Sequence, residues 1–288
     1  MKLNKNKETT ILIVGLGLMG GSYAKALQKK GYTVNAITKD ADTISYALEH
    51  KIIDNGSTEV TKEMVETADI IVFALYPHIF IDWLKTYQGF FKRGTVITDV
   101  TGVKSSIVYE IQNLLRDDVE FIAAHPMAGR EKSGVEFADD TIFRGANYIV
   151  VPTEKNTKEA IDLCKELGYE LGFADVSELT PEKHDEMIGF LSQLTHCIAI
   201  SLMCASDAPG LERYTGDSFR DLTRIARIND EMWSELFLLN KDVLLDQMEI
   251  FRNAFDKLEA TIKNEDRESM REMMRLSTER RARFDKNI

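Results

Sequence analysis

The sequence predicts a chain of the α/β class, in which a doubly wound, mostly parallel sheet is followed by an all-α part. Two observations support this prediction. Up to about residue 176, short and nearly continuous apolar runs alternate with helical segments, as expected for strands buried on both faces. Beyond that point only long helical periodicities with few breakers follow. We therefore expect one domain over residues 1–176 and a helical domain over residues 177–288.

The expected strands of the first domain are short apolar runs. They cover Thr10–Val14, Thr33–Thr38, Ile70–Leu75, Val96–Asp99, Phe121–Ala124 and Tyr148–Val151. Helical periodicity between them is clear over Ser22–Lys30, Thr43–Lys51 and Ser105–Leu115. Strands that alternate with helices form βαβ units, and these units build a parallel sheet.

The helical domain is expected to begin at Thr180, whose hydroxyl caps a helix that has Pro181 at its first position. Its helices are expected over Glu182–Ser206, Phe219–Arg227, Asn229–Asn264 and Arg267–Phe284. No window approaches the roughly 20 apolar residues of a membrane span, so we expect no membrane partner.

Composition excludes several functions. The 36 Lys and Arg residues against 47 Asp and Glu residues give a net charge of −11, so nucleic acid is not an expected partner. The three cysteines, Cys164, Cys197 and Cys204, form no C-x-x-C pair, which favours a reducing, cytoplasmic location. The five histidines show no metal-ligand spacing, so no metal site is expected.

A glycine motif near the start of the chain predicts a dinucleotide site. Gly15, Gly17 and Gly20 form G-x-G-x-x-G directly after the first expected strand, where they open a helix. Glycine permits the tight turn and the close approach of a pyrophosphate to the N–H groups of the helix N-terminus. The first domain is therefore expected to be Rossmann-like and to bind NAD or NADP.

The end of the second strand leaves the choice between NAD and NADP open. An acidic side chain at this place accepts hydrogen bonds from the ribose hydroxyls of NAD. Here Thr38 and Lys39 precede Asp40. The hydroxyl and the cation fit a 2′-phosphate, whereas Asp40 fits a ribose.

His125 is the expected base. It follows the run Phe121–Ala124 and hence stands at the carboxyl end of a strand, on the edge of the sheet where ligands bind. A neutral imidazole, with a pKa near about 6.5, can take a hydroxyl proton while hydride leaves the same carbon. Hydride transfer is therefore the leading chemistry.

Charged residues of the helical domain favour an anionic substrate. Arg220, Arg224 and Arg227 recur at i, i+4 and i+7, so we expect a cationic stripe on one helix. Asp221 is placed to hold the guanidinium of Arg224, and arginine binds carboxylates through two hydrogen bonds, which fits a small acid. His196 lies within the first long helix, where its pattern alone fits a core histidine as well as a ligand.

Four motifs together resemble the prephenate dehydrogenase family, which also includes arogenate and cyclohexadienyl dehydrogenases. They are Gly15–Ser22, His125–Gly129 with Glu131–Gly134, Leu194–His196, and Phe219–Ala226 with Trp233. The resemblance implies oxidative decarboxylation of prephenate to 4-hydroxyphenylpyruvate in tyrosine biosynthesis, with reduction of NAD(P)+. It also implies a homodimer that forms through the helical domain.

The resemblance also assigns roles to residues of this sequence. His125 would accept the ring hydroxyl proton, Arg224 would hold a substrate carboxylate and His196 would contribute to binding, which makes these three the expected catalytic set. The expected substrate contacts are Thr101, Glu131, Asp221 and Trp233. The expected cofactor contacts are Gly15, Leu16, Gly17, Leu18, Met19, Gly20, Thr38, Lys39 and Leu75.

One position departs from the pattern of the family. Relatives often carry serine in Asp-x-x-Ser-x-Lys, whereas this sequence has Gly102 at that place. Thr101 or Ser105 therefore has to supply the hydroxyl, or the site does without it. Three other functions stay open from the sequence: an arogenate dehydrogenase, another two-domain NAD(P)-dependent hydroxy-acid dehydrogenase, and a nucleotide-binding sensor without catalysis.

Overall fold

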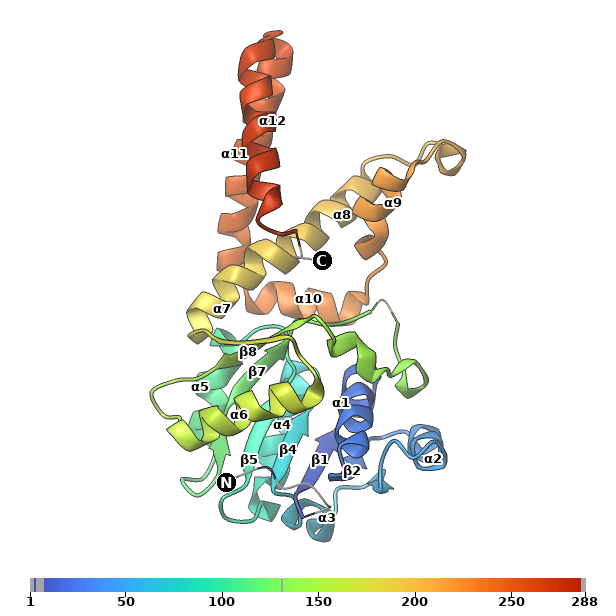
Figure 1. Cartoon of the computed structure of the whole chain (residues 1–288), viewed down its shortest axis with the longest axis vertical. Helices are drawn as coiled ribbons and strands as arrows, with labels where there is room; N and C mark the ends of the chain where they lie inside the picture. The colour runs from blue at the N-terminus through green and yellow to red at the C-terminus, as the bar shows by residue number, and fades with distance from the viewer. Residues whose placement is uncertain (1–2, 4–7, 131, 286–288) are drawn as a thin grey trace. The chain divides into compact units, whose positions relative to one another are not determined.

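The computed structural model describes residues 3, 8–130 and 132–285. The chain divides into two units, one up to Asn240 and one from Lys241 onward. The larger unit contains a sheet with helices on both faces and a group of helices beyond it (Figure 1). The smaller unit is a pair of helices.

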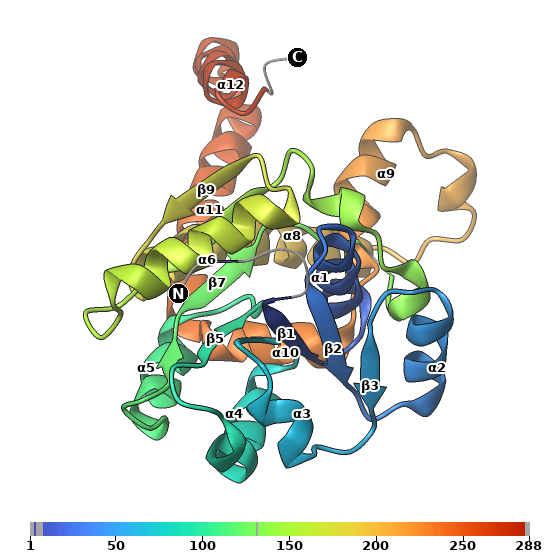
Figure 2. The same ribbon diagram turned by 60° about the horizontal axis from the view of Figure 1, so that its bottom comes forward.

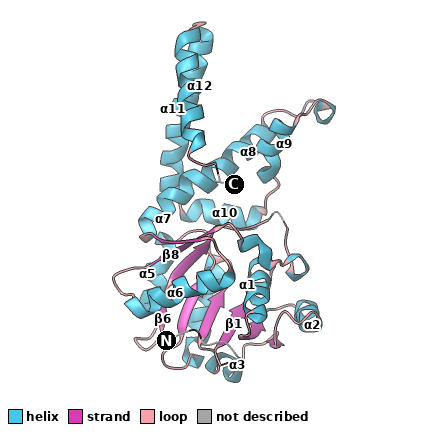
Figure 3. Ribbon diagram, viewed as in Figure 1, coloured by secondary structure: helices cyan, strands magenta, loops and turns pink. Residues whose placement is uncertain are grey.

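The larger unit is built on a six-stranded sheet in which every neighbouring pair of strands is parallel (Figure 3). Its order is β3-β2-β1-β4-β5-β6, with the bounds β1 (Thr10–Val14), β2 (Thr33–Ile37), β3 (Asn55–Ser57), β4 (Ile70–Phe73), β5 (Val96–Asp99) and β6 (Glu120–Phe121). The order reverses between β1 and β4, and open α/β sheets bind ligands at such a point, outside the carboxyl ends of the strands. The expected doubly wound fold is confirmed.

Helices cover both faces of this sheet. They are α1 (Leu18–Lys29), α2 (Ala41–Glu49), α3 (Lys62–Glu66), α4 (Pro77–Tyr87), α5 (Ser105–Leu114) and α6 (Lys158–Leu171). Helices α1 and α6 pack on one face, and α4 and α5 on the other (Figure 2). Along β1, Ile11 and Ile13 join the first buried cluster, whereas Leu12 and Val14 join the second. The continuous apolar runs therefore reflect burial on both faces.

A second, three-stranded sheet carries His125. It contains β7 (Ala123–Pro126), β8 (Asn147–Val151) and β9 (Asp175–Glu178), with β7 antiparallel and β9 parallel to β8. The expected single strand Phe121–Ala124 is wrong, because the chain leaves the first sheet at Ile122. The Ala124 N–H then donates to the Asp99 side chain at 3.1 Å, and β7 pairs with β8 instead.

The helices beyond the sheets begin as expected. They are α7 (Pro181–Ile188), a π-helical turn (Gly189–Gln193), α8 (Leu194–Cys204), α9 (Asp217–Thr223), a 3-10 turn (Arg224–Ala226) and α10 (Asp230–Leu239). Thr180 caps α7 by accepting the Lys183 N–H at 3.2 Å. The smaller unit contains α11 (Lys241–Lys263) and α12 (Arg267–Ala282).

Two helical expectations are wrong. The expected helix Asn229–Asn264 breaks at Asn240, whose side-chain amide donates to the Asp185 carbonyl at 3.1 Å. The expected helix Phe219–Arg227 ends at the 3-10 turn, and this turn packs on α8. At both places tertiary contacts override the local helical pattern.

One helical run is long and apolar enough to cross a membrane by length and composition. This run is Pro181–Cys204, with a mean hydropathy of 1.6, so the expectation that no window comes close was too strong. Its polar side chains His184 and Gln193 are buried and hydrogen-bonded within the larger unit. Such bonds are typical of a helix that packs within a fold.

Candidate active site

The glycine loop between β1 and α1 has the shape that a pyrophosphate requires. Gly15 adopts a φ of +94°, and a Cβ there would lie 2.4 Å from the Ala74 carbonyl oxygen and 2.8 Å from Leu75 Cδ2. A Cβ on Gly20 would lie 2.0 Å from the Gly15 carbonyl oxygen. Gly17, in contrast, is exposed, and nothing lies within 4 Å of the place of its Cβ. The loop is therefore closed toward the sheet and open toward a ligand.

The N-terminus of α1 supplies hydrogen-bond donors at this loop. Gly17 gives no side-chain cap, and the Gly21 N–H donates to the Gly17 carbonyl at 2.9 Å. The N–H groups of residues 18–20 precede this bond and fit the phosphates of a dinucleotide. The side chains of Leu16 and Leu18 are buried, so these residues would meet a cofactor through their backbone.

His125 is the first member of a chain of three hydrogen-bonded side chains, which we name the His-His-Asp chain. Its Nδ1 lies 2.9 Å from His184 Nε2, and His184 Nδ1 lies 2.7 Å from Asp185 Oδ1. His125 comes from β7, whereas His184 and Asp185 come from α7. His184 and Asp185 are buried and His125 is partly buried. The second sheet and the first helix beyond it therefore meet at this chain of bonds.

The Asp185 carboxylate is held at the start of α5. Its Oδ1 accepts the Lys104 N–H and its Oδ2 accepts the Ser105 N–H, each at 2.8 Å. No side chain of the α5 segment caps this helix, so a residue of α7 does so. Burial acts to raise the pKa of Asp185, but the hydrogen bond from His184 and the donors at α5 outweigh it and hold the pKa below its usual value. Asp185 is therefore a carboxylate.

The charge of Asp185 determines the tautomers of both imidazoles. A carboxylate only accepts, so His184 donates from Nδ1, and its Nε2 accepts from His125 Nδ1. The lone pair of His125 then lies on Nε2. Burial, followed by the neighbouring His184 and Lys104, lowers the pKa of His125 well below its usual value of 6.5. At neutral pH His125 is therefore an uncharged base with Nε2 as its basic atom.

A buried ion pair supports the strand end that bears His125. Lys104 Nζ lies 2.6 Å from Asp99 Oδ2 and donates to the Ala124 carbonyl at 2.7 Å, and both charged side chains are fully buried. The Thr101 hydroxyl donates to Asp99 and accepts from Lys104 at 3.1 Å. The single hydroxyl proton of Thr101 is therefore used within the protein.

A second cluster pairs His196 with Trp233. Their ring centroids lie 3.7 Å apart, with an interplanar angle of 31°. His196 Nδ1 donates to the Ser192 carbonyl at 2.9 Å, which leaves the lone pair on Nε2. Burial lowers the pKa of His196, so this imidazole is uncharged as well. His196 and His184 lie on the same continuous helical run, which links the two clusters.

Arg224 opens the 3-10 turn that packs on α8, the helix of His196. Arg220 points elsewhere, since it pairs with Asp217 at 2.6 Å. The expected stripe of arginines on one helix is wrong, because α9 ends before Arg224. The structure thus brings the turn of Arg224 to the helix of His196.

Helix α10 lies against the start of α4 and the loop that follows β5. Glu235 accepts the His78 backbone N–H at 3.0 Å and lies 2.9 Å from His78 Nδ1. A Cβ on Gly102 would lie 3.3 Å from Leu236 Cδ1. The helical part of this unit therefore covers strand ends beside the point where the strand order reverses.

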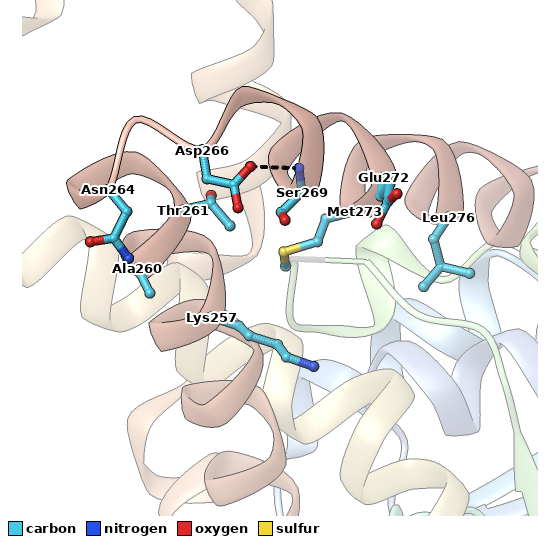
Figure 4. A pocket seen from close by; sticks show the side chains of 9 residues that line it. All are labelled: Lys257, Ala260, Thr261, Asn264, Asp266, Ser269, Glu272, Met273 and Leu276. Carbon is cyan, nitrogen blue, oxygen red and sulfur yellow. Dashed lines mark hydrogen bonds between the residues drawn. The ribbon is translucent and has the colours of Figure 1, made fainter.

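Glu131, an expected substrate contact, is outside the described residues. A surface hollow of the smaller unit lies between α11 and α12 and is lined by Lys257, Ala260, Thr261, Asn264, Asp266, Ser269, Glu272, Met273 and Leu276 (Figure 4). None of the expected site residues lines this hollow, so we do not assign the chemistry to it.

Comparison with known proteins identifies the family of the chain. Residues 23–176 match the nucleotide-binding domain of prephenate dehydrogenase, and residues 180–276 match its dimerization domain. The chain belongs to the prephenate dehydrogenase family. Members of this family are NAD(P)-dependent oxidoreductases.

Individual relatives agree with this family. The chain is 31% identical over 277 residues to the prephenate dehydrogenase of Bacillus subtilis, covering 93% of this chain and 74% of that relative. It is 27% identical to the cyclohexadienyl dehydrogenase of Zymomonas mobilis, over 89% of each chain. The crystal structure of Aquifex aeolicus prephenate dehydrogenase in complex with hydroxyphenyl propionate and NAD+ aligns with a TM-score of 0.88 and 32% identity, covering 96% of this chain and 98% of that chain. The expected family, fold class and NAD(P) use are confirmed.

The sequence interpretation missed His184 and Asp185. Both lie in an ordinary amphipathic helix, where a histidine and an aspartate attract no attention. The one available signal was their position, because the first helix after the sheets has to start beside the strand ends. A buried His–Asp pair at that junction is a candidate support for a base on a neighbouring strand.

Proposed function

We propose that this chain oxidises prephenate to 4-hydroxyphenylpyruvate and carbon dioxide with NAD(P)+, as a step of tyrosine biosynthesis. The observation that carries the proposal is the His-His-Asp chain, which leaves a neutral imidazole with its lone pair on His125 Nε2. His125 follows Ala124, whose N–H bonds to Asp99 at the carboxyl end of β5. The glycine loop follows β1 at the same edge of the parallel sheet, so base and cofactor share one side of the fold.

In the proposed reaction, His125 Nε2 accepts the proton of the ring hydroxyl. Hydride leaves the carbon that bears this hydroxyl, carbon dioxide leaves from the opposite ring carbon, and the ring becomes aromatic. A bound nicotinamide cofactor supplies the hydride acceptor. The proton returns from His125 to the phenol oxygen, so the products are 4-hydroxyphenylpyruvate, carbon dioxide and the reduced cofactor. Aromatisation makes the overall step downhill.

The helical part is proposed to bind a carboxylate of prephenate. Arg224 holds one carboxylate through two charged hydrogen bonds. His196 and Trp233, which stack on each other, form a wall of the site beside it. Glu131 and Asp221 stay proposed substrate contacts, whereas Thr101 acts through the Asp99–Lys104 pair. One cation thus faces one carboxylate of the acid, and a neutral aromatic wall lies beside it.

Turnover assays with two substrates test the proposal. The purified chain is incubated with prephenate or arogenate and either NAD+ or NADP+, and both reduced cofactor and aromatic product are measured. Reduced cofactor and 4-hydroxyphenylpyruvate should appear in equal amounts with prephenate. Reduction of the cofactor only with arogenate would assign that substrate instead, and no reduction with either substrate would overturn the proposal.

Three variants test the residue roles. His125→Asn should lower kcat by about 10²–10⁴-fold, because it removes the base. Arg224→Ala should mainly raise KM for prephenate, because it removes binding that ground state and transition state share. Arg220→Ala is the matched control, since this arginine pairs with Asp217, and it should leave both constants unchanged. Parent-like kinetics of the first two variants would remove the site assignment.

We further propose a homodimer that forms through a helical domain of residues 177–288. The family model over residues 180–276 is described as a dimerization domain. Large apolar side chains are also exposed on α8, α11 and α12, among them Met203, Ile250, Phe255 and Met274. A soluble monomer rarely exposes so many. Light scattering should therefore give twice the chain mass of 32.7 kDa, and the mass of one chain at micromolar concentration would contradict the dimer.

The proposed setting is the cytoplasm, without a nucleic-acid or membrane partner. The net charge of −11 opposes binding to polyanions. The cysteines are free thiols, as in proteins of reducing compartments. Retention of the chain on DNA or on lipid vesicles at physiological salt would contradict this part of the proposal.

A further inference from the structure

The residues that follow β2 are placed to read the adenosine ribose of a dinucleotide. The Gly15 N–H donates to the Ile37 carbonyl at 2.8 Å, so the glycine loop touches the end of β2. Thr38 and Lys39 follow directly, and the Thr38 N–H donates to the Ser57 carbonyl at 3.2 Å. In a Rossmann-like fold, side chains at this place distinguish a 2′-hydroxyl from a 2′-phosphate.

Asp40, the carboxylate nearest to this place in the sequence, is engaged by its own helix. As the N-cap of α2, its Oδ1 accepts the Asp42 N–H at 3.3 Å. Its Oδ2 accepts the Thr43 N–H at 3.1 Å and the Thr43 hydroxyl at 2.5 Å. A carboxylate that binds the ribose hydroxyls of NAD turns its oxygens toward the ribose. Three donors at the start of α2 already use Asp40, so turning both oxygens toward a ribose would weaken the cap of α2.

Thr38 and Lys39 offer a hydroxyl, which donates and accepts, and an ammonium, which only donates. Lys39 is exposed, and its ammonium forms no ion pair with any residue that the structure describes. The Thr38 hydroxyl is half-buried and likewise has no hydrogen-bond partner within the described ranges. Both a hydroxyl and an ammonium can donate to phosphate oxygens, whereas an ammonium cannot accept from the ribose hydroxyls as a carboxylate does.

We propose that Thr38 and Lys39 make this site selective for NADP+ over NAD+ by binding the 2′-phosphate. The inference rests on the proposed function only in that the chain binds a nicotinamide dinucleotide. The physical reason is the cap of α2, which engages the Asp40 carboxylate, while the Lys39 ammonium forms no ion pair among the described residues of an acidic chain. A 2′-phosphate gives that cation a counter-charge, and a 2′-hydroxyl does not.

Equilibrium binding of the cofactors, without prephenate, tests the selectivity. The dissociation constants of NADP+ and NAD+ are measured by calorimetry for the full chain and for Lys39→Ala. NADP+ should bind the parent about 10- to 100-fold more tightly than NAD+, the range expected for one or two charged hydrogen bonds. Lys39→Ala should weaken NADP+ by a similar factor and leave NAD+ nearly unchanged. Raising the ionic strength should weaken NADP+ more than NAD+.

Two further variants sharpen this test. Lys158→Ala, which removes an exposed lysine of α6, is the matched control for charge and should change neither dissociation constant. Thr38→Asp should weaken NADP+ and strengthen NAD+, because it supplies the acceptor that Asp40 does not.

The outcomes separate this inference from the proposed function. Equal or tighter binding of NAD+ by the parent, or equal weakening of both cofactors in Lys39→Ala, would overturn the selectivity. The expected order of binding in a protein that does not turn over prephenate would support the selectivity and contradict the proposed reaction. Binding of neither dinucleotide would overturn both.

Discussion

Replacing His184 by leucine should disable His125 without removing it. In the parent, His125 Nδ1 donates to His184 Nε2 at 2.9 Å, and this bond keeps the lone pair on the other nitrogen. Leucine deletes the acceptor, and a buried donor without a partner costs about 1–3 kcal/mol. If this energy is lost from the reactive tautomer, kcat should fall by about 5- to 150-fold, because 1.36 kcal/mol corresponds to a factor of ten. KM for prephenate should change little, since Arg224 is untouched.

Conservative variants at the same position provide the controls. His184→Gln places an amide oxygen near the position of Nε2, so it can still accept from His125 and should recover most of kcat. His184→Asn retains a donor for Asp185 but is too short to reach His125, so it should behave like the leucine variant. The assay is steady-state kinetics across pH, with thermal unfolding of each variant as a check on folding. A folded His184→Leu or His184→Asn enzyme with parent-like kcat would refute the tautomer argument.

Three other predictions follow from the same geometry. The kcat of the parent should be flat from about pH 8 down to about pH 6.5 and fall only at lower pH. The reason is that His125 must be neutral to act as a base, and its lowered pKa moves the loss of activity to lower pH. A fall of kcat centred near pH 7 would contradict this environment of His125. Gly15→Ala should lower the melting temperature, because Gly15 has a positive φ and a Cβ there would clash with the Ala74 carbonyl. Gly17→Ala should have the melting temperature of the parent but bind NADP+ more weakly in calorimetry. Equal melting temperatures of the two variants would count against this shape of the loop. Gly102→Ser should not raise kcat, since His184 already orients His125. Its Cβ would lie 3.3 Å from Leu236 Cδ1, which has to give way by only a few tenths of an ångström. A higher kcat would show instead that the missing hydroxyl limits the reaction.

The parallel sheet could be predicted because burial on both faces leaves continuous apolar runs. The expected bounds of Thr10–Val14 and Val96–Asp99 coincide with β1 and β5. Strand β9, with the sequence D-V-S-E, lacks such a run and is not fully buried at any position, so no apolar pattern marks it. The break at Ile122 was equally hidden, because it depends on a bond to Asp99 from a distant part of the chain.

Motifs identified the candidate site residues, but not the groups that hold them. A helix is ordinarily capped by its own neighbours in sequence, and such caps can be read from local patterns. Asp185 caps α5 from another helix, so its role and that of His184 left no local pattern. The stripe through Arg224 failed for a related reason, because periodicity assumes that a helix continues, and packing of the 3-10 turn on α8 ended α9 earlier.

The cap of α5 by Asp185 has a consequence for hybrid enzymes. A chimera that keeps its own nucleotide-binding half and borrows the helical half of a relative also borrows the two groups that set the tautomer of His125. The kcat of such hybrids should then depend on whether the first helix of the relative forms the same hydrogen bonds with the start of α5. Swaps made after Asp185 would keep the native contacts between α7 and the start of α5 and exchange only the part that is proposed to bind the substrate carboxylate.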